Sequence, residues 1–130
     1  AIYAPFAAEV DGRCDLIVNR PIGEVFERLA AADLILTHDT FVSHLAAACG
    51  IPAIVLYTVT DGRIWRPLAT SPFFSIQSKP ALQCPNMKPD GTCTRYYDSC
   101  ELTCSTGVEA PAVLQRIAEA VEVLRDTNVR

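Results

Sequence analysis

The sequence of 130 residues lacks the features that mark several classes of protein. It has no run near the roughly 18 consecutive apolar residues of a membrane-spanning helix, so we expect no transmembrane segment. Lysine and arginine are scattered and the net charge is -4, which gives no electrostatic footprint for nucleic acid and no acidic tail. Repeats and internal linkers are also missing. These absences leave one globular domain, for which 50% hydrophobic residues can form a packed core.

The start of the chain also lacks two common features. Its first residues, Ala1-Ile2-Tyr3, include no initiator methionine, and no basic and then apolar signal-peptide pattern follows them. We therefore expect this chain to be part of a longer protein.

What is present is a strand, a polar turn and a helix within residues 34–52. The apolar or β-branched run 34–37 contains no Gly or Pro and predicts a buried strand of a parallel sheet. Small and apolar residues at 41–49, followed by Gly50 and Pro52, predict a helix that ends at a left-handed residue. Open α/β sheets bind ligands at such strand-to-helix turns.

The turn holds the strongly polar groups of this stretch: His38, Asp39 and Thr40, with Ser43 and His44 in the first helical turn. Unpaired N–H groups at a helix start bind phosphate, and Thr40 can add its hydroxyl. His44 can donate to a phosphate oxygen or stabilise charge on a leaving group, whereas Asp39 suits sugar hydroxyls or a role in holding the turn. The set indicates a diphosphate linked to a polyol. The simpler alternative is an ordinary helix cap and a helix histidine without a ligand.

Strands and helices alternate along the rest of the chain. Further strands are expected at 15–18, 53–57 and, shorter, 73–77; helices at 4–13, 22–32 and 110–125; and a short irregular or 3₁₀ segment at 64–68. Right-handed crossovers place the first three strands parallel in one sheet. The fold class is therefore α/β, half of a doubly wound fold.

Two of the helices show an apolar stripe that is expected to face inward. In the 22–32 helix the stripe consists of Ile22, Val25, Phe26 and Leu29. In the last helix it consists of Val113, Leu114, Ile117, Val121 and Leu124. Residues 126–130 are expected to fray.

The six cysteines are unevenly distributed. Cys14 and Cys49 are expected to be small buried hydrophobes. The other four lie between the last strand and the last helix: Cys84, Cys93, Cys100 and Cys104. Four thiols are the number needed for a structural zinc, but the C-x2-C spacing of most zinc sites is missing. Two disulfides, or four reduced thiols without a ligand, are the alternatives, and disulfides would need an oxidising compartment.

Residues 32–57 and the Thr60-Asp61 turn resemble the C-terminal domain of the heptosyltransferase-type glycosyltransferases of family 9. Members carry a strand ending in Asp-Thr-Gly, two variable residues, His-Leu, an alanine-rich helix, Gly-x-Pro and a second strand ending in a Thr-Asp turn. This chain has Asp39-Thr40-Phe41-Val42-Ser43-His44-Leu45 and Gly50-Ile51-Pro52 at the matching positions. The resemblance extends back through the 22–32 helix and forward to the cysteine segment and the last helix.

The resemblance implies a GT-B enzyme, in which two Rossmann-like domains face each other across a cleft. Residues 1–130 would form the single C-terminal donor-binding domain, a three-layer αβα unit with a mostly parallel sheet, a cysteine-rich loop at 84–104 and a closing helix at 110–125. The N-terminal domain, which carries the acceptor site and the catalytic base, would be absent from this chain. The donor would be a nucleotide sugar, typically ADP-heptose, and the acceptor of lipopolysaccharide type. No cofactor is required, and the location would be cytoplasmic, with peripheral membrane association through the acceptor as an option.

The resemblance also assigns residue roles. Asp39, Thr40 and Phe41 match the turn that contacts the diphosphate and sugar, and His44 lies beside them as the group that would stabilise the leaving nucleotide. The loop that would border the nucleotide base consists of Arg20, Pro21 and Ile22. The family's Gly after Asp-Thr is Phe41 here, and its large side chain is expected to limit how closely a phosphate approaches the backbone.

Two other functions remain as alternatives. One is a non-catalytic, degenerate Rossmann-like module in which Phe41 closes the phosphate site and the cysteine loop, with or without a metal, serves an interaction. The other is a different GT-B enzyme, such as a sugar epimerase.

Overall fold

The computed structural model describes residues 19–94, 100 and 103–128. Its elements are, in chain order, α2 (Ile22–Ala30), β1 (Ile35–His38), α3 (Phe41–Ala48), β2 (Ala53–Tyr57), α4 (Gly62–Trp65), β3 (Phe73–Gln77), α5 (Lys79–Gln83), α6 (Thr103–Thr106) and α7 (Ala110–Asn128). The helix expected at 4–13, the strand expected at 15–18 and Cys14 lie outside the described residues.

The three described strands form one parallel sheet in the order β1-β2-β3. His38 at the end of β1 lies opposite Leu56, and Tyr57 at the end of β2 lies opposite Gln77, so the carboxyl ends of the strands meet at one edge. The predicted strands at 34–37 and 53–57 are confirmed to within one residue. The strand at 73–77 is also confirmed, although it is as long as β2 and not shorter.

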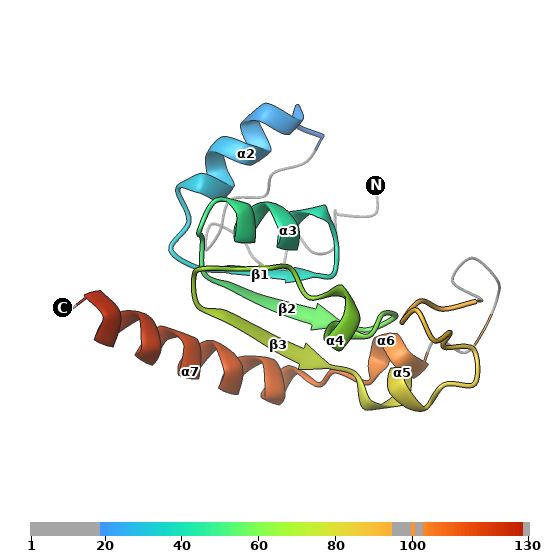
Figure 1. Cartoon of the computed structure of the whole chain (residues 1–130). Coiled ribbons are helices and arrows are strands. Elements are labelled where there is room, and N and C mark those ends of the chain that lie inside the picture. Colours follow the sequence, from blue (N-terminus) through green and yellow to red (C-terminus); the bar gives the residue numbers. More distant parts are fainter. Residues whose placement is uncertain (1–18, 95–99, 101–102, 129–130) are drawn as a thin grey trace.

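Helices flank this sheet, which makes the α/β, Rossmann-like prediction correct (Figure 1). Helix α3 packs on β1 and β2, whereas α7 packs on β3 and β2. Alternate residues of the strands supply the core on the α3 side, because successive side chains in a strand point to opposite faces. The buried cluster consists of Ile35, Ala46, Ile51, Ala53, Val55 and Tyr57.

The end of α3 confirms the stop signal in the sequence. Gly50 adopts a φ of 69°, the left-handed conformation that favours glycine, and Pro52 follows it. Cys49, by contrast, is exposed, so the prediction that it is a small buried hydrophobe is wrong. It occupies the C-cap position, where the helix leaves the core.

The inward face expected for α2 is only partly buried. Ile22 is 64% exposed and Phe26 43% exposed, and α2 has no buried residue among those described. Only the C-terminal part of the stripe, at Leu29, packs against the core cluster. Regular spacing therefore predicted the apolar stripe, but only one end of that stripe reaches the described core.

The last helix differs from expectation at two places. Leu114 is 66% exposed, because it lies at the edge of the stripe that includes Val113, Ile117 and the fully buried Ala120. The helix also continues to Asn128, so residues 126–128 are helical where fraying was expected, and residues 129–130 lie outside the described residues. No helix in the described part of the chain is both long and apolar enough to cross a membrane.

Of the segment expected to be irregular or 3₁₀ at 64–68, residues 66–68 are irregular as predicted, whereas Ile64 and Trp65 belong to the short α-helix α4. Asp61 caps it, because its side chain accepts a hydrogen bond from the Arg63 N–H at 2.9 Å. The backbone becomes extended at Arg66, the residue before Pro67, which ends the helix.

Candidate functional site

A pocket of about 430 Å³ opens at the carboxyl ends of β1 and β2. Its lining comes from His38 at the end of β1 and the two residues after it, residues 58–60, which follow β2, and Ser105 in α6. This is the crevice in which open α/β sheets bind ligands, and its volume lies in the range of small-molecule sites. The pocket therefore lies at the turn that the sequence singled out.

Thr40 connects the pocket to the start of α3. As the N-cap residue it accepts a hydrogen bond from the Val42 N–H at 3.3 Å, so the simpler interpretation of Thr40 as a helix cap is correct. Ser43 is fully buried and donates its hydroxyl to the Thr40 carbonyl at 2.8 Å, which fixes the first turn. Thr40 also lines the pocket, so capping and ligand contact are compatible at this residue.

Asp39 holds two turns together. Its N–H donates to the Leu56 carbonyl at 3.2 Å, and its Oδ2 accepts a hydrogen bond from the Thr60 hydroxyl at 2.7 Å. The side chain is only 11% exposed. Of the two roles expected for Asp39, holding the turn is the one that these contacts display.

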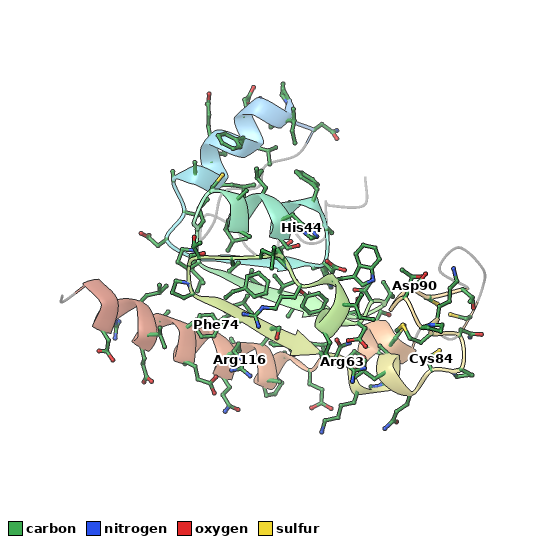
Figure 2. All side chains as sticks on the ribbon, viewed as in Figure 1. His44, Arg63, Phe74, Cys84, Asp90 and Arg116 are labelled. Carbon is green, nitrogen blue, oxygen red and sulfur yellow. The ribbon has the colours of Figure 1, made fainter. Side chains whose placement is uncertain are left out.

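His44 lies near this network but outside the pocket wall. Its Nε2 is 4.0 Å from Asp39 Oδ1, and its side chain is 52% exposed. Figure 2 shows His44 on α3. Neither His44 nor Phe41 is among the lining residues, and Phe41 is 57% exposed. Phe41 therefore does not fill the pocket.

The loop expected to border a nucleotide base lies elsewhere. The structure does not bring Arg20, Pro21 and Ile22 into the pocket wall, and all three are exposed. Arg20 Nε instead lies 3.9 Å from Glu24 Oε2 within α2, which Figure 1 shows on the far side of α3 from the sheet.

Sequence reasoning missed part of the pocket. Thr58 and Val59 follow β2, and the parallel pairing of β1 with β2 would have indicated them, since the carboxyl ends of neighbouring parallel strands meet. Ser105 had no sequence signal. It reaches the pocket from α6, which packs against α5.

The cysteine segment does not form an assembled metal site in the described residues. Cys84 ends α5, Cys93 forms an isolated antiparallel bridge with Met87, and Cys104 belongs to α6. Within the described ranges no three His, Cys, Asp or Glu side chains gather as metal ligands, and none of the five described cysteines is in a disulfide. Burial raises the pKa of the Cys104 thiol, which favours its neutral form. The structural zinc stays a prediction, and these residues show no disulfide.

Comparison with known proteins gives one match. A search of curated proteins and a search of solved structures each found no significant match. The family model described as glycosyltransferase family 9 (heptosyltransferase) matches residues 7–89, more than half of the chain, and this range contains both strand-end turns that line the pocket. The match and the parallel, helix-flanked sheet agree with the resemblance carried by residues 32–57, and the chain belongs to glycosyltransferase family 9 (heptosyltransferase).

Proposed function

We propose that residues 1–130 are a single donor-binding domain of a glycosyltransferase, and that the pocket beside Thr40 holds the diphosphate of a nucleotide sugar. The observation that supports this most strongly is the position of the pocket, at the carboxyl ends of β1 and β2 and at the start of α3. The positive end of a helix dipole and unpaired N–H groups favour an anion there. An ADP-heptose-like donor and a lipopolysaccharide-type acceptor are the substrates that we propose.

The polar lining suits both parts of such a donor. The hydroxyls of Thr40 and Thr58 can donate to phosphate oxygens, and the Thr60 hydroxyl, whose proton is donated to Asp39, can accept from a sugar hydroxyl. The lining contains no lysine or arginine, so stabilisation of the negative diphosphate would depend on the helix start and on His38. This domain alone should therefore bind a donor weakly, and we propose that a second domain supplies further cationic groups.

In the proposed reaction, a carboxylate from the second domain removes the proton from an acceptor hydroxyl. That oxygen then attacks the anomeric carbon of the donor sugar with inversion, and the nucleoside diphosphate leaves. The helix start at Thr40 stabilises the departing diphosphate. The ring of His44 lies outside the pocket wall, with its Nε2 4.0 Å from Asp39 Oδ1. His44 would therefore stabilise the leaving diphosphate at longer range. No metal is required for this step.

A non-catalytic module is the competing function, and it depends on Phe41 closing the phosphate site. The exposed Phe41 side chain lies outside the lining and leaves the pocket open, which favours donor binding. A sugar epimerase of the GT-B class would use the same pocket, and only an assay of sugar transfer against epimerisation separates it from a transferase.

Calorimetric titration with ADP, UDP, GDP and their sugar conjugates tests the proposal. We expect saturable binding of one nucleotide series, ADP before the others, which Thr40→Ala weakens and Thr40→Ser preserves. Absence of binding by every nucleotide, in this chain and in a fusion to a family-9 N-terminal domain, would contradict it. Elemental analysis of the same protein tests the structural zinc at the cysteine segment, and the absence of zinc and iron would remove it.

A further inference from the structure

A second pocket, of about 340 Å³, lies where α4 and α5 meet the ends of β2 and β3. Its polar lining residues are Tyr57, Arg63, Arg66, Ser75 and Gln77. We propose that this pocket is a second ligand site, and that it binds an oxyanion, either a phosphoryl or a carboxylate group, through Arg66 and the Tyr57 hydroxyl. This inference goes beyond the proposed donor binding and does not depend on it.

Arg66 supplies the charge. Its guanidinium carbon lies 5.2 Å from the centre of the Phe73 ring, a cation–π contact that holds the side chain over the same face of β3 that carries Ser75. Among the described residues no carboxylate forms an ion pair with Arg66. A guanidinium that is held on an aromatic ring and is weakly hydrated still has N–H groups in its plane that can bind an oxyanion.

Tyr57 supplies a donor that lacks a partner. The residue is fully buried, and in the described part of the chain its hydroxyl has no hydrogen-bond partner. A buried polar group left unpaired costs about 1–3 kcal/mol, so such groups are uncommon in folded proteins. An oxyanion in the pocket would accept this hydrogen bond.

The surroundings of Tyr57 keep its hydroxyl protonated. Burial, together with the Asp39 carboxylate and against the smaller opposing effect of Arg66, raises the pKa of Tyr57 to about 12. The hydroxyl therefore keeps its proton at neutral pH and is a donor.

The remaining polar lining groups add little net charge to the pocket. Gln77 is fully engaged: its Nε2 donates to the carbonyls of Tyr57 and Thr60 at 3.1 Å each, and its Oε1 accepts from the Gly62 N–H at 2.8 Å. Arg63, which Figure 2 shows near the end of β3, is paired with Asp61 and is largely neutralised. No lining residue carries a carboxylate, so Arg66 provides one uncompensated positive charge.

The site is distinct from the donor pocket. The two linings share no residue, because they lie on either side of the turn that follows β2. An oxyanion at Arg66 and a nucleotide at Thr40 can therefore be titrated independently.

The test is a titration of the full chain with inorganic phosphate, with glucuronate and with glucose, followed by amide chemical shifts at constant ionic strength. Each titration is run without ADP and again with ADP present. We expect saturable shifts at Arg66, Ser75 and Gln77 for phosphate or glucuronate and none for glucose. Whichever of the two anions binds with the higher affinity identifies the ligand group as phosphoryl or carboxylate. The Arg66→Gln variant should weaken this binding at least about tenfold, the loss expected for one charge-assisted hydrogen bond, and Tyr57→Phe should weaken it less.

The matched control is Arg125→Gln, which removes an exposed arginine from α7 and should leave oxyanion affinity unchanged. Equal affinity in wild type and Arg66→Gln, competition between ADP and the oxyanion, or no saturation by either acid would overturn the proposal. Amide spectra of each variant confirm that it is folded before it is titrated.

Discussion

The hydroxyl of Thr60 donates a hydrogen bond to Asp39 Oδ2 over 2.7 Å, and this bond joins the turn after β2 to the turn after β1. Both residues line the larger pocket. Because Asp39 also donates its N–H to Leu56, the wall of the pocket is held at two points by residues far apart in the sequence. The carboxylate therefore has a structural role here whether or not a ligand is bound.

The Thr60→Val variant removes this bond and keeps the shape of the side chain. We expect a loss of about 1–2 kcal/mol in the free energy of unfolding, since Asp39 would keep a poorly solvated carboxylate without its donor. Urea denaturation measures the change, and Thr70→Val at an exposed position serves as the control. Equal stability of Thr60→Val and wild type would show that the Asp39–Thr60 bond contributes nothing.

The contact between Gly62 and Tyr57 predicts a second effect. A Cβ added at Gly62 would lie 2.6 Å from Cδ2 of the buried Tyr57 ring, so the ring or the backbone would have to shift. The Gly62→Ala variant should therefore lose about 1–3 kcal/mol. Gly23→Ala is the matched control, because nothing lies within 4 Å of its added Cβ and stability should stay equal or rise slightly. Similar melting temperatures for the two variants would contradict this packing.

Much of the fold could be predicted because the strands leave a direct signal. Buried parallel strands are continuous apolar runs, and 53–57 is such a run. Gly50 marks the end of α3, because glycine favours the left-handed conformation found there. The helical spacing wrongly predicted that Ile22 and Leu114 are buried, because both fit an apolar stripe but are exposed. Burial depends on which element lies opposite each position, and periodicity does not carry that information.

Tyr57 predicts how stability changes at alkaline pH. Its pKa is about 12 in the folded protein, against an ordinary value near 10, so the folded state holds the proton more tightly. The stabilisation is fully present below pH 10 and is lost as the pH rises through 12, with a slope that approaches about 1.4 kcal/mol per pH unit. Urea denaturation between pH 8 and about pH 12 measures it. In Tyr57→Phe this part of the slope should vanish, and an unchanged slope would contradict the prediction.

Asp61 predicts the opposite behaviour in acid. The hydrogen bond from Arg63, with Nε 3.0 Å from Asp61 Oδ1, lowers the pKa of this carboxyl below its ordinary value. Its stabilisation is therefore present above the ordinary pKa and is lost as the pH falls through the lowered folded value. The Asp61→Asn variant keeps the capping oxygen and removes the charge, so the wild type should be more stable near pH 7 and the two should converge in strong acid.

Stability curves against pH for both proteins, with the exposed Asp33→Asn as a control, give the comparison for Asp61. A stability difference that stays constant from pH 7 down to strong acid would show that the charge of Asp61 has no part in it.

The candidate site was only partly predictable. Asp39 and Thr40 could be found because they follow a buried strand and precede a helix, and the same logic applied to β2 would have found Thr58. Ser105 depends on the packing of α6 against α5, a contact between distant segments that no local pattern encodes. His44 has the spacing of the family motif, but its ring lies outside the pocket wall.

Mapping amide chemical shifts during titration with ADP tests whether a nucleotide diphosphate binds between the ends of β1 and β2. We expect saturable shifts at residues 39–42 and 58–60 and at Ser105, which Thr40→Ala weakens and Thr40→Ser keeps. Shifts that fall elsewhere in the chain, or that are identical in Thr40→Ala and Thr40→Ser, would contradict it.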